Sequence, residues 1–167
     1  MKAPDDLNIR PATPADVPLL LSLVRELADY EHLADEVVAD EATFRESMFG
    51  ARAGPEAVIA EVGRAAAGFA IYFHNFSTFL GRRGLYLEDL YVRPPHRGQA
   101  VGKALLSHLA KLALQRNCGR LEWSVLDWNR PARDFYEAQG ARPNPAWVNY
   151  RLTGEALQRL AGGDIIE

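Results

Sequence analysis

One stretch of the sequence, from Leu85 to about Asn117, restricts the possible folds of this chain more than any other. Residues 85–92 ("LYLEDLYV") alternate like a strand, a turn rich in proline and glycine follows, and residues 98–117 carry apolar side chains at helical spacing. The apolar run "LEWSVL" at 121–126 then predicts a further strand. Two consecutive strands joined by a helix lie parallel in one sheet, so the sequence predicts a strand–helix–strand crossover.

The elements before this crossover have the pattern of antiparallel hairpins. A tight turn at Gly63-Arg64 joins two predicted strands, and Gly81 to Gly84 is predicted to form another turn. Thr13 and Pro14 have the residue types of a helix N-cap and first helical position. The other predicted elements are strands at 7–13, 56–62, 64–78 and 147–152 and helices at 14–32, 40–49, 130–140 and 154–160. This order predicts an α+β fold, with one sheet and helices on its faces, in a single domain over residues 1–167.

Composition excludes several classes of protein. The net charge of −3 argues against a nucleic-acid-binding protein, which usually carries a basic face. The longest apolar run, at 17–23, is far shorter than the ~20 residues of a membrane span. Cys118 is the only cysteine, and the N-terminal residues lack the apolar stretch of a signal peptide. We therefore expect a cytoplasmic protein with no membrane or nucleic-acid partner.

The turn between the strand at 85–92 and the next helix has the features of an anion site. Gly98 and Gly102 permit close backbone approach, and the helix behind them supplies free N–H groups and the positive end of its dipole. Arg97 and Lys103 add positive charge. The spacing matches neither a P-loop nor a dinucleotide-binding fingerprint. A turn of this composition can also be a plain connection, so the wider sequence has to decide.

Several motifs resemble one known family. The segment "RGQAVGKALL" resembles the Arg/Gln-x-x-Gly-x-Gly/Ala turn with which GCN5-related N-acetyltransferases (GNATs) bind the pyrophosphate of acetyl-CoA. The segments "IRPATPAD", "RELADYE", "GLYLEDLYV" and "VLDWNRPARDFYEAQGA" resemble the spermidine/spermine and thialysine acetyltransferase branch. The resemblance implies the GNAT fold, a mixed, mostly antiparallel twisted sheet flanked by helices. Ala100 replaces the family's middle glycine, and the contact survives there if this residue is not needed at positive φ.

The resemblance also implies which residues bind acetyl-CoA as co-substrate. The backbone of the strand before the turn would hold the pantetheine arm, and the turn would hold the pyrophosphate. The implied set is Leu90, Tyr91, Val92, Arg97, Gly98, Gln99, Ala100, Val101, Gly102, Lys103, Asn129 and Tyr136. Asn129 is equally suited to be the N-cap of the helix at 130–140.

Acetyl transfer to an amine requires a neutral nucleophile. An alkyl amine with a pKa of about 10.4 is neutral in roughly one molecule per thousand at pH 7.4, a penalty of about 4 kcal/mol that a base must partly offset. By resemblance Glu88 is that base, acting through water, and Tyr136 is the general acid, since a phenol stays protonated at neutral pH. Otherwise Glu88 is a solvated strand carboxylate and Tyr136 a packed aromatic. Asp89 is predicted to point to the opposite face of the strand from Glu88.

The acceptor is expected to be a small cationic amine. Tyr30, Glu31 and Glu88 are the candidate substrate-binding residues, whereas Asp35 and Glu36 fit a solvated helix end. Two arginines in "STFLGRRG" disfavour a long polycation and suit an amino acid whose carboxylate pairs with arginine.

The sequence thus indicates an acetyl-CoA-dependent N-acetyltransferase that acts by direct attack in a ternary complex on a polyamine, diamine, thialysine or lysine-like amino acid. The alternatives are a protein N-acetyltransferase and a catalytically silent acyl-CoA-binding module. The resemblance implies a homodimer. The four histidines lack metal-ligand spacing, so no metal is expected.

Overall fold

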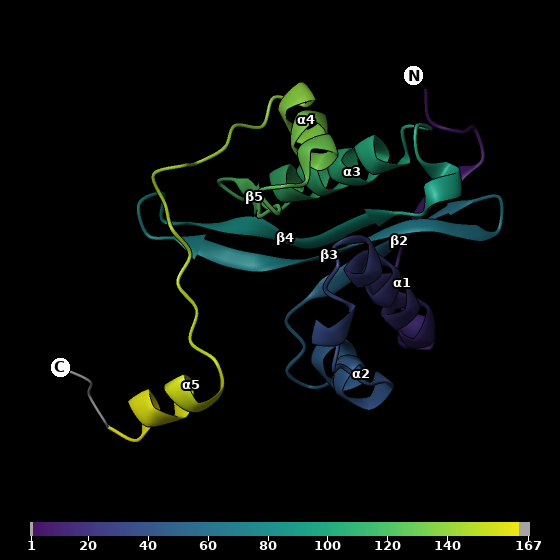
Figure 1. Cartoon of the computed structure of the whole chain (residues 1–167). Coiled ribbons are helices and arrows are strands. Elements are labelled where there is room, and N and C mark those ends of the chain that lie inside the picture. The colour runs from purple at the N-terminus through teal and green to yellow at the C-terminus, as the bar shows by residue number, and fades with distance from the viewer. Residues whose placement is uncertain (1, 164–167) are drawn as a thin grey trace. The chain divides into compact units, whose positions relative to one another are not determined.

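The computed structural model of the chain describes residues 2–163 (Figure 1). These residues form two compact units that divide after Ser124, and each unit is described by itself.

The first unit is built on one five-stranded sheet. Its strands lie in the order β1 (Leu7–Pro11), β2 (Glu56–Val62), β3 (Ala65–Ser77), β4 (Arg82–Val92) and β5 (Leu121–Trp123). The first four strands pair antiparallel in sequence order, and β5 pairs parallel with β4. The expected mixed, mostly antiparallel sheet with a crossover from β4 to β5 is therefore confirmed.

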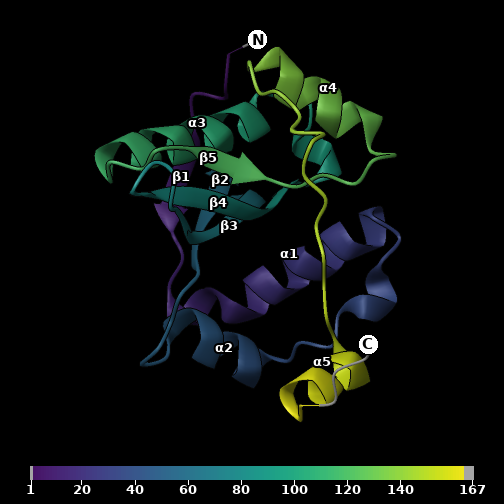
Figure 2. The same ribbon diagram turned by 90° about the vertical axis from the view of Figure 1, so that its left-hand side faces the viewer.

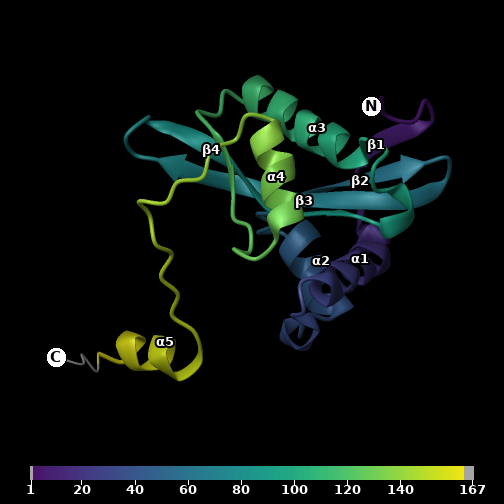
Figure 3. The same ribbon diagram turned by 45° about the horizontal axis from the view of Figure 1, so that its top comes forward.

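Helices cover both faces of this sheet. The helices α1 (Val17–Tyr30) and α2 (Glu41–Phe49) pack on one face, and α3 (Val101–Gln115) packs on the other (Figure 2). The view from the α3 side shows α3 running obliquely over the strands (Figure 3). A core cluster joins α1 to the strands through fully buried side chains that include Leu20, Leu23, Ile59 and Phe69.

The start of α1 is tied to the edge of the sheet. The guanidinium of Arg10 on β1 donates to both carboxylate oxygens of Asp16, at 2.8 and 2.9 Å, and its Nε donates to Glu61 on β2 at 2.9 Å. Asp16 also accepts from the backbone N–H of Thr13, at 2.8 Å, so a one-turn 3-10 helix at Pro14–Asp16 leads into α1. The hydrogen bond from Arg10 is the main reason that the pKa of Asp16 is held well below its usual range.

The predicted starts of β4 and α3 were each wrong by three residues. The β3–β4 pairing continues to Ser77 and Arg82, so β4 begins at Arg82 and the turn closes at Gly81, whose φ is +60°. The helix α3 begins at Val101 rather than Gly98, because Ala100 just before it has a left-handed backbone conformation (φ +59°, ψ +12°) that a right-handed helix cannot include.

The second unit contains two helices, α4 (Arg130–Ala138) and α5 (Gly154–Ala161), close to their predicted positions. The strand predicted at 147–152 is not formed; those residues are irregular, and β5 ends at Trp123 rather than at residue 126. The alternating pattern of 147–152 suits a strand, but a strand needs hydrogen-bond partners, and residues 125–163 contain no other strand.

Candidate active site

A β-bulge interrupts β4 at the predicted base. Ile71 on β3 pairs with Asp89 and Tyr72 pairs with Leu87, so Glu88 is the extra residue that opposes no partner. Bulges re-aim side chains and occur next to active sites. Glu88 is exposed, whereas Asp89 is half-buried and lies, like its partner Ile71, on the face of the sheet that α1 covers.

Asp89 is the functional candidate that the sequence did not predict. Burial is the main cause that raises its pKa to about 6, and the charges of Glu88 and Glu31 raise it further. Glu31 caps the C-terminal end of α1, and burial also raises its pKa. The sequence did contain a signal for Asp89, namely two successive acids in the apolar strand "LYLEDLYV". Successive side chains of a strand point to opposite faces, so only one of the two acids is readily solvated. The three carboxylates lie close enough to interact and together favour a cation.

Tyr30, the last residue of α1, lies beside these acids and contacts Arg97. The Arg97 guanidinium carbon lies 4.6 Å from the centre of the Tyr30 ring and 5.5 Å from that of Tyr91. Its Nε donates to the carbonyl oxygen of Val92 at 2.8 Å. These contacts are cation–π interactions and a main-chain hydrogen bond. Arg97 was expected at the rim of the glycine turn, and here it links that turn to Tyr30 and β4.

The glycine turn has the backbone of an anion site. Gly98 has a φ of +71° and Ala100 a φ of +59°, and α3 starts at the next residue, Val101. The first turn of a helix leaves N–H groups without intrahelical acceptors, and residues of positive φ beside them form concave nests that bind anions. The turn therefore fits a pyrophosphate. Ala100 is at positive φ after all, which costs an L-residue about 1–2 kcal/mol.

The edge of β4 opens beyond the bulge. The pairing of β5 with β4 runs only from Leu85 to Leu87 in the described residues. Residues 90–92 therefore have β3 as a neighbour on one side, and their other backbone edge is open to a ligand. The hydrogen bond from Arg97 to the Val92 carbonyl shows that at least one main-chain group at this edge is available to a donor. This geometry suits the amides of a pantetheine arm.

The second unit holds the other two candidates, Asn129 and Tyr136. Asn129 is buried, and its side-chain oxygen accepts from the N–H of Ala132 at 3.2 Å, so it is the N-cap of α4. Tyr136 is half-buried on α4, with its ring centre 5.2 Å from that of Phe135. Glu88 and Tyr136 thus belong to different units.

No group of three or more histidine, cysteine, aspartate or glutamate side chains within residues 2–163 is arranged to hold a metal ion. In the same part of the chain, none of the helices has the length and apolar character needed to cross a membrane.

Comparison with known proteins assigns the family. The model of the Acetyltransferase (GNAT) family matches residues 21–141. A thialysine N-epsilon-acetyltransferase of Bos taurus is 38% identical over 165 residues, covering 92% of this chain and 96% of the relative. This chain belongs to the GNAT family. It is an N-acetyltransferase, and the glycine turn of this GNAT chain lies within the matched residues.

Other relatives agree with this assignment. An L-ornithine N5-acetyltransferase of Arabidopsis thaliana is 32% identical to this GNAT chain, over 92% of the chain and 87% of the relative. Among solved structures, an integron cassette protein from the mobile metagenome of V. cholerae has a TM-score of 0.80 at 28% identity, over 93% of this chain and 98% of that one. An aminoglycoside acetyltransferase from a soil metagenome shares the fold, with a TM-score of 0.75 at 15% identity.

Proposed function

We propose that this N-acetyltransferase moves the acetyl group of acetyl-CoA to a primary amine of a small cationic molecule, by direct attack in a ternary complex. The acceptor class comprises polyamines, diamines and amino acids of the thialysine, lysine or ornithine type. The relatives named for thialysine and for L-ornithine support this class.

The observation that carries the proposal is the group of carboxylates at the end of α1. Glu31 and Asp89 interact across α1 and β4, and Glu88 adds a third negative charge at the bulge. A cationic amine placed there neutralises charges that repel one another, so its binding is favoured. Tyr30, fixed by its contact with Arg97, would form one wall of the acceptor site.

The chemistry needs three proton transfers. In the proposed mechanism Glu88 accepts one proton from the ammonium group through a water molecule, and the neutral amine nitrogen attacks the thioester carbonyl carbon. The carbon–sulfur bond then breaks, the nitrogen loses its second proton to solvent, and Tyr136 donates its phenolic proton to the departing CoA thiolate. The product is an amide, and both proton-transfer groups return to their starting states by exchange with solvent.

Acetyl-CoA would bind along the open edge of β4 and at the glycine turn. The main-chain groups of Leu90, Tyr91 and Val92 would hold the pantetheine arm. The N–H groups of the turn would hold the pyrophosphate, assisted by the charge of Lys103; the proposed set there is Gly98, Gln99, Ala100, Val101, Gly102 and Lys103. Arg97 would bind the pyrophosphate after releasing the Val92 carbonyl. By the family resemblance, Asn129 and Tyr136 are also proposed to bind acetyl-CoA.

We further propose that the protein is a cytoplasmic homodimer whose chain acts as one catalytic domain. Support for self-association comes from the second unit, where Trp147, Val148 and Tyr150 are 73%, 72% and 95% exposed. Large apolar side chains that are this exposed and this close in sequence are typical of an interaction surface.

Thiol release from acetyl-CoA, measured against a panel of amines, tests the function. We expect turnover with lysine, ornithine and short diamines, with Glu31→Gln raising KM for the amine and leaving KM for acetyl-CoA unchanged. Rapid acetylation of a folded protein without turnover of any free amine would instead identify a protein N-acetyltransferase.

A further inference from the structure

A second group of polar side chains lies farther along the face of the sheet that carries Asp89. On β3, the side chains of Ile71, Phe73 and Asn75 alternate onto this face, since they are two residues apart. The helices α1 and α2 cover the part of the face near Ile71, while the β3–β4 hairpin extends beyond them (Figure 1). Within the first unit, the sheet therefore continues as an open surface past the acid cluster, which consists of Glu31, Glu88 and Asp89.

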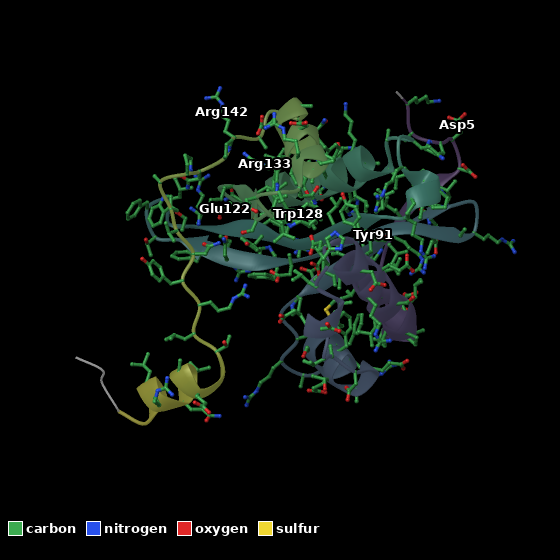
Figure 4. The ribbon with its side chains drawn as sticks, viewed as in Figure 1. Asp5, Tyr91, Glu122, Trp128, Arg133 and Arg142 are labelled. Carbon is green, nitrogen blue, oxygen red and sulfur yellow. The ribbon has the colours of Figure 1, made fainter. Side chains whose placement is uncertain are left out.

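The group is centred on Glu122 of β5. Asn75 on β3 donates through Nδ2 to Glu122 Oε2 at 2.9 Å, and Arg120 Nε lies 2.7 Å from the same oxygen. Figure 4 labels Glu122 toward the hairpin end of the sheet and Tyr91 toward the end that α1 covers. Two donors thus fix this carboxylate in place, and both use one of its oxygens.

A glycine makes this arrangement possible. Gly84 on β4 lies between Asn75 and Glu122, and a Cβ atom there would come within 2.2 Å of Asn75 Oδ1 and 3.2 Å of Arg120 Cγ. The missing side chain lets Asn75 cross β4 to reach β5. Asn75 Oδ1 is buried and has no hydrogen-bond partner in the structure, an arrangement that costs free energy. The unpartnered Asn75 Oδ1 therefore lowers the stability of the sheet while Asn75 Nδ2 orients Glu122. Buried polar atoms without partners often occur at functional sites.

An apolar surface joins this group to the acid cluster. The rings of Phe73 and Tyr86, paired across β3 and β4, lie 5.2 Å apart, and the Tyr86 hydroxyl is 2.9 Å from Ser124 Oγ on β5. Glu122 pairs with Tyr86, so it lies about 7 Å along the strands from the level of Asp89 and one strand, about 5 Å, across. A four-carbon stem such as that of lysine can span this distance over the two rings.

We propose that Glu122, held by Asn75 and Arg120, determines acceptor specificity by binding the second ammonium group of the substrate, and that Arg120 binds its α-carboxylate. The acceptor is then an amino acid with a terminal amine, whose zwitterionic end meets the Glu122–Arg120 pair while the terminal amine meets Glu31 and Asp89. The carboxylate distinguishes this acceptor from a diamine, which would use Glu122 alone. This inference rests on the proposed function, since it assigns the far end of the same acceptor site.

Three amines of equal chain length test it: lysine, cadaverine (which lacks the carboxylate) and n-pentylamine (which also lacks the second ammonium). In the full-length protein, Glu122→Gln should raise KM for lysine and cadaverine by about tenfold or more, the scale of a lost charged hydrogen bond, and leave KM for n-pentylamine unchanged. Arg120→Met should raise KM for lysine by more than it changes KM for cadaverine, because it removes the carboxylate contact in addition to one of the two donors that hold Glu122. KM for acetyl-CoA should not change in either variant.

The matched control is Glu61→Gln, which alters another strand carboxylate paired with an arginine, on β2, and should change none of the three KM values. Equal effects of Glu122→Gln on all three amines, or no effect on any, would overturn the inference while leaving the proposed function intact. A preference for cadaverine that Arg120→Met does not alter would overturn the carboxylate contact. Failure of the unaltered protein to acetylate any of the three would overturn the proposed function and this inference with it.

Discussion

The two units of the chain differ in how they bury apolar side chains. In the first unit, residues from Val17 to Ala113 supply every buried apolar side chain of the described chain, and Phe69 is fully buried among them. In residues 125–163 the one buried side chain is that of Asn129, which caps α4. Trp147 and Tyr150 are exposed there. The first unit therefore has a core of its own, whereas the second leaves most of its large apolar side chains exposed.

The largest expected effect tests this contrast directly by truncating one large aromatic in each unit. Phe69→Ala should lower the free energy of unfolding by about 3–5 kcal/mol, because it leaves a cavity in a packed core. Trp147→Ala should change the stability of the first unit by less than about 0.5 kcal/mol, because its side chain is solvated. Denaturant titration measures both values.

The same pair of variants also tests the proposed homodimer. Trp147→Ala should weaken self-association in sedimentation experiments, and Phe69→Ala, at temperatures where it stays folded, should not. A loss of stability with Trp147→Ala as large as that with Phe69→Ala would show that the second unit is packed after all.

The next largest effect tests whether the second unit contributes to catalysis through Tyr136. Tyr136→Phe keeps the ring next to Phe135 but removes the proton, so kcat should fall by about 10²-fold, as for a positioned acid, while CoA binding changes little. The basic limb of the pH profile of kcat should also change. An unaltered kcat would leave thiolate protonation to water and confine the chemistry to the first unit. Phe135→Leu is the control for packing on α4.

A smaller effect concerns the stability that the first unit loses by burying the carboxylate of Asp89. Because the pKa of Asp89 is raised to about 6, the folded protein binds an extra proton between pH 4 and 6, so this group lowers stability as pH rises through that window. Asp89→Asn should therefore be more stable than the unaltered protein above pH 6, by up to about 3 kcal/mol, and equal to it below pH 4.

Activity should move in the opposite direction, since Asp89→Asn removes a carboxylate from the acceptor site and should raise KM for the amine. The exposed Asp5, paired with Lys2, provides the control, because Asp5→Asn should alter neither quantity. The informative quantity is the difference in unfolding free energy between Asp89→Asn and the unaltered protein. A difference no larger at pH 7 than at pH 4 would contradict the burial of this charge.

The smallest effect comes from the strained turn. Ala100→Gly should raise stability by about 1 kcal/mol, because glycine adopts the positive φ of this position without steric conflict. Ala110→Gly, the same substitution at an exposed position inside α3, should lower stability by a similar amount. If both substitutions changed the Tm of thermal unfolding in the same direction, the turn would not be strained.

Sequence patterns predicted the first unit well because its structure depends on local periodicity. The helical spacing of α3 and the tight turns that join β2 to β3 and β3 to β4 each reflect interactions within a few residues. The glycine turn was likewise identified, since residue types that favour positive φ and free N–H groups are visible in the sequence. The predicted strand at 147–152 was wrong, because a strand forms only where another strand pairs with it.

By itself, the sequence determined the order of the elements in the first unit, the α+β class and the family to which the chain belongs. Only the tertiary structure showed that Glu88 sits in a bulge, that Asp89 rather than Glu88 faces Glu31, and that Arg97 turns toward Tyr30. It alone showed that Asn75 reaches Glu122 across Gly84. The physical reason is that register, bulges and side-chain contacts between distant strands arise from pairing and packing, which no local pattern of residues encodes.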